Sequence, residues 1–153
     1  MRTDHLPFAM PDRAYSLDQE WKFLTFMHWE VDQEKLAKYI PDGLEIDLYE
    51  GRAYVGVIPF VMSNVRPRIA FSVPGISTFP EINIRTYVKC NGKAGVLFLT
   101  LEAQSMVTCA YAPRAYGLPY RYSIARVSAS EGSYKWETVS YTHLRAHETI
   151  PDL

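Results

Sequence analysis

The chain has 153 residues, of which 48% are hydrophobic and 22% are charged, and its formal net charge is −1. This composition is typical of one globular domain, and the nearly neutral charge gives no electrostatic reason to expect nucleic acid or an anionic membrane as a partner. No apolar run reaches the ~18 residues that cross a bilayer, and the N-terminal segment is no signal peptide, so we expect a cytoplasmic protein with no membrane association.

The N-terminal part of the chain predicts an arm, a strand and a helix. Residues 1–20 are rich in proline and polar residues and predict an N-terminal arm or loop. Residues 21–31 are aromatic and β-prone, which predicts a strand. Asp32 is a favourable N-cap, and the apolar residues after it recur at helical spacing. A short helix over residues 33–40, ended by a Pro-Asp-Gly sequence, is therefore expected.

The next segment predicts a hairpin followed by a loop. Apolar and polar residues alternate over residues 44–49, a Glu-Gly turn follows at 50–51, and a second strand is expected over residues 52–62. Residues 63–79 contain two prolines and a glycine, so we expect a loop there.

The clearest hairpin signal is the Asn91-Gly92 pair, because a type I′ turn needs positive φ at both central positions. It separates strands expected over residues 79–90 and 94–101. The first strand has one apolar face, which is expected to meet the core. Its other face, which is expected to meet either water or a polar cavity, carries Glu81, Asn83, Arg85, Tyr87 and Lys89.

The remaining elements complete a mostly β (α+β) fold. Small apolar residues over 103–113 predict a second short helix, and residues 120–129 and 134–139 predict two further strands. Antiparallel hairpins with alternating faces need a closed barrel or a double sheet to remove their exposed edges. We therefore expect an antiparallel β-barrel or double sheet with two short helices.

The C-terminal segment, residues 140–153, begins with SYTHLRAHET and resembles a translated sequencing adapter. We expect it to be a non-native tail, which would leave residues 21–139 as a partial domain truncated at its C-terminus. His143 and His147 have a spacing found in some zinc sites. Nothing upstream supplies a partner cluster, so no metal site is expected.

A second polar segment follows the predicted second helix and reads YGLPYRY over residues 116–122. It has two interpretations. Tyr120 and Arg121 either belong to a loop that enters a strand with partly buried tyrosines, or they form a pocket rim that offers a phenol and a guanidinium to a carboxylate or carbonyl ligand.

Six segments between Trp21 and Gly132 resemble the uncharacterised YqjF-like family of the acetoacetate decarboxylase-like superfamily. They are HWEVD at 28–32, IPDGLEID at 40–47, GRAYVG at 51–56 together with PF at 59–60, FPEINIRTYV at 79–88, GVLFLTLEA at 95–103, and LPY at 118–120. The resemblance implies that the β-barrel or double sheet is of the acetoacetate decarboxylase type, with an internal pocket for a small molecule and no cofactor.

The resemblance also implies a site that lacks its nucleophile. Acetoacetate decarboxylases carry a catalytic glutamate ahead of an Asn-Gly turn, and Glu81 stands at that position. They then carry a Pro-Lys-Lys sequence whose first lysine forms a Schiff base, whereas this chain has Pro119-Tyr120-Arg121. Tyrosine cannot form an imine and arginine stays protonated, so Schiff-base decarboxylation is not expected. Lys22 lies near the place of the decarboxylases' pocket arginine.

Three functions remain open from the sequence. The first is a pocket protein without covalent chemistry that binds a small oxygenated or anionic molecule. The second is a non-covalent lyase, hydratase or isomerase on a keto or enol acid, with Glu81 as the general acid or base. The third is a structural or interaction domain without a ligand; self-association is left open in each case. The expected ligand-binding residues are Tyr120, Arg121, Arg85, Asn83 and Lys22.

Overall fold

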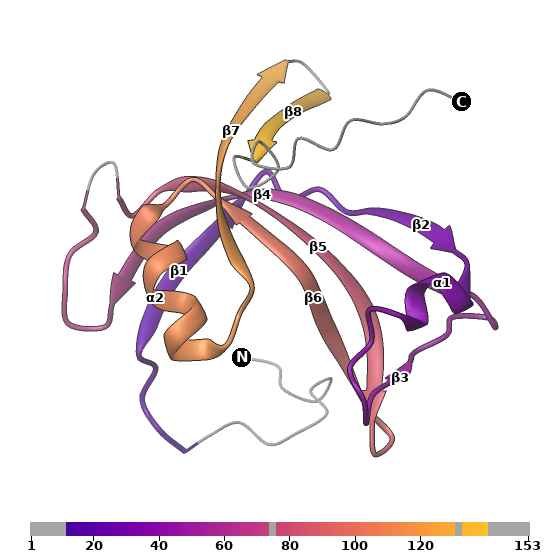
Figure 1. Cartoon of the computed structure of the whole chain (residues 1–153). Helices are drawn as coiled ribbons and strands as arrows, with labels where there is room; N and C mark the ends of the chain where they lie inside the picture. The colour runs from indigo at the N-terminus through magenta and orange to yellow at the C-terminus, as the bar shows by residue number, and fades with distance from the viewer. Residues whose placement is uncertain (1–11, 74–75, 131–132, 141–153) are drawn as a thin grey trace, which may run out of the picture.

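A computed structural model describes residues 12–73, 76–130 and 133–140 (Figure 1). The strands are β1 (Leu17–Lys22), β2 (Met27–Val31), β3 (Glu45–Ile46), β4 (Ala53–Pro67), β5 (Phe79–Cys90), β6 (Lys93–Ala103), β7 (Tyr120–Ser130) and β8 (Ser133–Ser140). The helices are α1 (Gln33–Ala37) and α2 (Met106–Tyr116).

The strands form one eight-stranded sheet in the order β1-β4-β5-β6-β7-β8, with β2 also pairing with β4 and β3 with β5. Figure 1 shows that the sheet is strongly curled and that α2 lies on its concave side. The prediction of a mostly β fold with two short helices is confirmed. One pairing differs from the predicted antiparallel arrangement: β6 and β7 are parallel, because α2 carries the chain back between them.

Both faces of the central strand β5 contain buried residues, so of the two environments expected for its polar face, water is excluded at Glu81 and Asn83, which line a cavity. Ile82 and Val88 are buried on the convex side. Glu81 is equally buried on the concave side, where it lies opposite Phe60 of β4 and Ala103 of β6. The main apolar cluster lies on this concave side and comprises Ile58, Phe60, Met62, Phe79 and Ala103, with Val65, Cys109 and Tyr120 packed against it.

The β5–β6 hairpin is as predicted. Asn91 has a φ of 51° and Gly92 a φ of 76°, which are the positive values that a type I′ turn requires. The two strands pair from Cys90↔Lys93 along most of their length. The turn sets the register from Cys90↔Lys93 to Arg85↔Phe98, and an irregularity between Ile84 and Arg85 shifts it by one residue, which brings Glu81 opposite Ala103.

Replacing Gly92 by alanine is expected to lower the free energy of unfolding by about 1–2 kcal/mol, because a Cβ disfavours the left-handed backbone conformation. Gly95→Ala is the matched control, since Gly95 lies in β6 with its nearest non-neighbouring atom 3.9 Å from an added Cβ. The control should be neutral or slightly stabilising. Urea denaturation of both variants tests this, and equal losses of stability would contradict it.

Two local predictions are wrong near the N-terminus. The single strand predicted over residues 21–31 is two strands, β1 and β2, which both pair with β4. The extended conformation is interrupted between the two strands, where Phe23 has a φ of 55°. β1 also begins at Leu17, inside the segment predicted to be an arm.

The predicted hairpin over residues 44–62 is also wrong. Only the isolated bridge Tyr49↔Arg52 closes the expected turn. β3 instead pairs with β5, through Glu45↔Lys89 and Ile46↔Val88. β4 continues to Pro67, so that the loop predicted from residue 63 begins later.

Both helices occur close to the predicted places. Asp32 is the N-cap of α1 and accepts a hydrogen bond from the backbone N of Lys35 at 2.9 Å. α2 begins after the N-cap Ser105, continues through Pro113 and ends at Gly117, whose φ is 66°. Within the described part of the chain, neither helix has the length and apolarity needed to span a membrane.

Candidate functional site

A cavity of about 520 Å³ lies on the concave side of the sheet, between β4, β5, β1 and α2. Its walls are mainly apolar, with Phe60, Met62 and Leu101 contributed by the sheet. Polar side chains from β5 and β7 are embedded in this apolar lining, namely Glu81, Asn83 and Tyr120. The cavity therefore combines a large apolar surface with a few polar groups, which is the usual composition of a small-molecule site.

Glu81 and Tyr120 form the central pair of this cavity. Glu81 is only 2% exposed, and the hydroxyl of Tyr120 donates a hydrogen bond to its Oε2 at 3.1 Å. Tyr120 reaches Glu81 because it begins β7 and pairs with Leu101 of the neighbouring strand β6. The structure thus brings together two residues that the sequence predicted to share a pocket.

Burial dominates the acid–base behaviour of this pair. Removal from water disfavours the ionised carboxylate and raises the pKa of Glu81 to about 7, against the smaller opposing effect of the Tyr120 hydrogen bond. Burial and the neighbouring Glu81 also raise the pKa of Tyr120. Near neutral pH, Glu81 therefore populates both its acid and its carboxylate forms, while Tyr120 stays a hydrogen-bond donor.

Asn83 adds a third polar group on the same strand face, two residues after Glu81. It lines the cavity and is 3% exposed, and its Oδ1 atom has no hydrogen-bond partner among the described residues. An unpaired buried amide oxygen is costly, because it has lost its water without a replacement. A ligand or an ordered water in the cavity would satisfy this atom.

Arg121 lies outside the cavity, which corrects the predicted Tyr-Arg couple. Consecutive residues of a strand point to opposite faces, so Arg121 faces away from the side that Tyr120 occupies. It pairs in register with Glu102, and its side chain is exposed.

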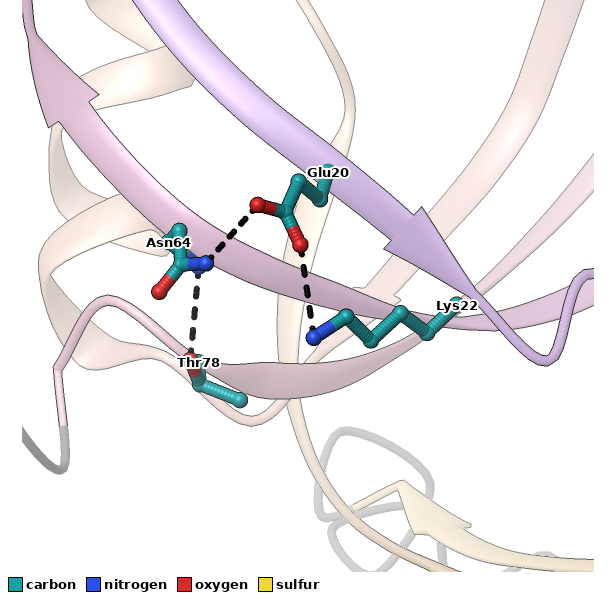
Figure 2. A network of polar contacts seen from close by, with 4 residues as sticks. All are labelled: Glu20, Lys22, Asn64 and Thr78. Atoms are coloured by element: carbon teal, nitrogen blue, oxygen red, sulfur yellow. Dashed lines mark hydrogen bonds and ion pairs between the residues drawn. The ribbon is translucent and has the colours of Figure 1, made fainter.

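Lys22 is also outside the cavity, for the same reason. Its neighbour Trp21 faces inward and packs on Phe60, with ring centroids 4.8 Å apart. Figure 2 shows that Lys22 instead approaches Glu20, at 3.3 Å between Nζ and Oε2, while Asn64 donates to the other carboxylate oxygen at 3.0 Å. The ammonium group of Lys22 is thus occupied on the convex side of the sheet.

Arg85 shares the concave face with Glu81 and Asn83 but lies farther along β5, beyond the residues that line the cavity. Its guanidinium lies over the ring of Phe26, 5.4 Å from the centroid, and donates to the hydroxyl of Tyr87 at 3.4 Å. Of the predicted ligand-binding residues, Tyr120 and Asn83 line the cavity with Glu81, whereas the three cations do not.

Sequence reasoning missed the contribution of α2 to the site. Its N-cap Ser105 is buried, and Thr108 and Tyr111 follow on the helix face that lines the cavity. The Ser105 hydroxyl accepts from the backbone N of Thr108 at 3.2 Å, so the capping hydroxyl is partly used by the helix itself. A capping pattern in the sequence identifies such a serine, but only the tertiary structure places it in a cavity.

The charge of the lining is a defining feature of the site. Among the described residues, Glu81 is the single ionisable acidic residue of the lining, and the lining contains no lysine, arginine or histidine. No group of three or more potential metal ligands occurs in the described ranges. His143 and His147, whose spacing resembles a zinc motif, lie outside those ranges.

Comparisons with known proteins agree with this architecture. Residues 18–151 match the DUF2071 family, described as an uncharacterized conserved protein. The uncharacterized protein YqjF of Bacillus subtilis (strain 168) is 37% identical over 115 residues, which cover 75% of this chain and 48% of YqjF. The chain therefore spans about half the length of this curated relative.

Two solved structures show the fold. Acetoacetate decarboxylase from Legionella pneumophila is 14% identical with a TM-score of 0.61, and the match covers 92% of this chain and 58% of the decarboxylase. The enduracididine biosynthesis enzyme MppR is 15% identical with a TM-score of 0.62, over 79% of this chain and 46% of MppR. The chain thus has an acetoacetate decarboxylase-like fold, and the family match makes it a member of the DUF2071 family, as YqjF-like features of its sequence had indicated.

Proposed function

We propose that the chain binds a small oxygenated molecule in the cavity on the concave side of the sheet. The observation that carries the proposal is the hydrogen bond between buried Glu81 and partly buried Tyr120 within a mainly apolar cavity. The unpaired Oδ1 of Asn83 supports it, because this atom gains a partner when a ligand donor or a ligand-bound water enters. The fold relative MppR, which has been solved in complex with pyruvate, also accommodates a small carbonyl compound.

A catalytic version of this proposal is favoured by one observation, the burial of the Glu81 carboxyl group in the cavity wall, which raises its pKa to about 7. A carboxyl group with this pKa exchanges protons efficiently near neutral pH, as general acid–base catalysis requires. The reaction would be a non-covalent lyase, hydratase or isomerase step on a keto or enol acid. Schiff-base decarboxylation is not proposed, because the cavity lining among the described residues holds no lysine. A cytoplasmic location and self-association stay predictions from the sequence.

The test is to compare Asn83→Leu with the parent chain in binding titrations against a panel of ketones, keto acids and alcohols. Loss of one neutral hydrogen bond is expected to weaken binding by about 2–10-fold. Arg121→Gln is the matched control, because Arg121 is a polar residue of the sheet that lies outside the cavity. The affinity of this variant for the panel compounds should equal that of the parent chain. Equal weakening by both substitutions, or binding of no compound, would argue against the proposal.

A further inference from the structure

The distribution of cations over the fold bears on the charge of the ligand. None of the three cations expected to hold an anion reaches the cavity. Lys22 pairs with Glu20, and Arg85 contacts Phe26 and Tyr87. Arg121 lies on the opposite face of the sheet. The described lining itself offers no positive side chain. A ligand carboxylate would therefore lose its water without gaining an ion pair.

The acidic group in the cavity adds to this effect. Glu81 lies at the polar part of the lining, where an oxygenated ligand head would also have to lie. Two carboxyl groups in one buried site cannot both ionise at low cost, since like charges repel strongly away from water. An anionic ligand would thus have to force the proton to remain on Glu81 and would still be poorly solvated.

An uncharged head group meets none of these costs. The protonated form of Glu81 can donate to a carbonyl or hydroxyl oxygen, and the Oδ1 of Asn83 can accept from a ligand hydroxyl or a bridging water. The rest of the cavity favours an apolar body. The apolar wall that would contact this body is formed by side chains from β1, the loop after β4 and α2, among them Trp21, Phe71, Val107 and Tyr116.

We infer that this cavity selects uncharged molecules with an apolar body and a single carbonyl or hydroxyl head, and discriminates against carboxylates that carry the same apolar body. This inference rests on the proposed function and names the ligand class of the same site. It departs from the expectation of an anionic ligand, because side-chain alternation directs the expected cations away from the chamber.

Heptyl methyl ketone and octanoate form a matched pair of probes, because they share a seven-carbon tail and differ by a methyl group in place of a carboxylate oxygen. Both are titrated into the full chain at about pH 6, where octanoate is mostly ionised and Glu81, whose burial raises its pKa to about 7, is mostly protonated. We expect the ketone to bind at least about 10-fold more tightly, in view of the cost of burying an unpaired carboxylate. Protein amide shifts in NMR spectra provide the readout.

The outcomes separate the two proposals. Octanoate affinity equal to or higher than that of the ketone, weakened by Asn83→Leu, would overturn the inference and leave the pocket proposal intact. Binding of neither probe would overturn both. A preference for the ketone that Asn83→Leu reduces supports both.

A charge-gain variant tests the physical cause directly. Val107 lines the cavity from α2 and is exposed, so a longer polar side chain fits at this position. Val107→Lys should raise octanoate affinity at least about 3-fold relative to Val107→Gln, which has a similar length without the charge. Equal octanoate affinity in the two variants, with ketone binding retained, would show that missing positive charge is not the basis of selection and would overturn the inference.

Discussion

Replacing Glu81 by glutamine is expected to stabilise the chain by up to about 3 kcal/mol at about pH 8 and to have little effect near pH 4.5. The folded chain holds the pKa of Glu81 at about 7, above the value of 4.5 for an unperturbed glutamate. The contribution of protonated Glu81 to the free energy of unfolding is fully present below the unfolded pKa of 4.5. It is lost as the pH rises through the folded pKa of about 7. Glutamine carries no charge, can still accept from Tyr120, and so escapes the loss at high pH.

The measurement is urea denaturation of parent and variant across this pH range, with the difference in unfolding free energy plotted against pH. Glu20→Gln is a control of opposite sign, because the hydrogen bond from Asn64 and the proximity of Lys22 lower the pKa of Glu20. That exposed group contributes stability above its unfolded pKa and loses it as the pH falls. A pH-independent difference for Glu81→Gln would show that Glu81 is not desolvated. A gain in stability from Glu81→Gln would mean that the parent chain keeps an ionisable group in its cavity at a cost in stability. Such a trade-off between stability and activity is typical of functional sites.

Phe60→Ala is expected to lower the free energy of unfolding by about 3–5 kcal/mol, which is the usual cost of deleting a buried phenylalanine ring. Phe60 is 1% exposed, belongs to the main apolar cluster and packs against Trp21 of β1. Its loss would remove part of the cavity wall and the ring contact with Trp21 of β1.

Phe71→Ala is the matched control, because Phe71 also lines the cavity but is 92% exposed. Its substitution should change stability by less than about 0.5 kcal/mol. Thermal and urea unfolding of the two variants provides the comparison. A small effect of Phe60→Ala, or similar effects at both positions, would mean that the concave side is not the stabilising core.

The elements that local rules govern were predicted well. The Asn91-Gly92 turn has the backbone angles that its two residues favour, and Asp32 caps α1 as its side chain allows. The mostly β composition also led to the right class of fold. Each of these depends on the conformational preferences of a few neighbouring residues, which a single sequence displays.

Errors arose where the outcome depends on distant pairing or on parity along a strand. The partner of β3 is β5, and no property of residues 44–49 identifies it. Family resemblance predicts that Glu81, Tyr120 and Arg121 share a pocket, whereas the structure joins only Glu81 and Tyr120 and directs Arg121 to the other face. Adjacent positions in a strand cannot line the same cavity when the strand is regular, so the alternation rule would have excluded Arg121 once β7 was predicted.

The parallel β6–α2–β7 crossover implies an order of assembly for this chain. The hydrogen bond between Tyr120 and Glu81 spans 39 positions of sequence, whereas the β5–β6 hairpin closes across a tight turn. Chain-closure entropy favours the short-range hairpin, so we expect the contact of Glu81 with Tyr120 of β7 to form after it. Glu81 would then be more hydrated in the isolated hairpin than in the complete fold, and its raised pKa would be a property of the assembled sheet.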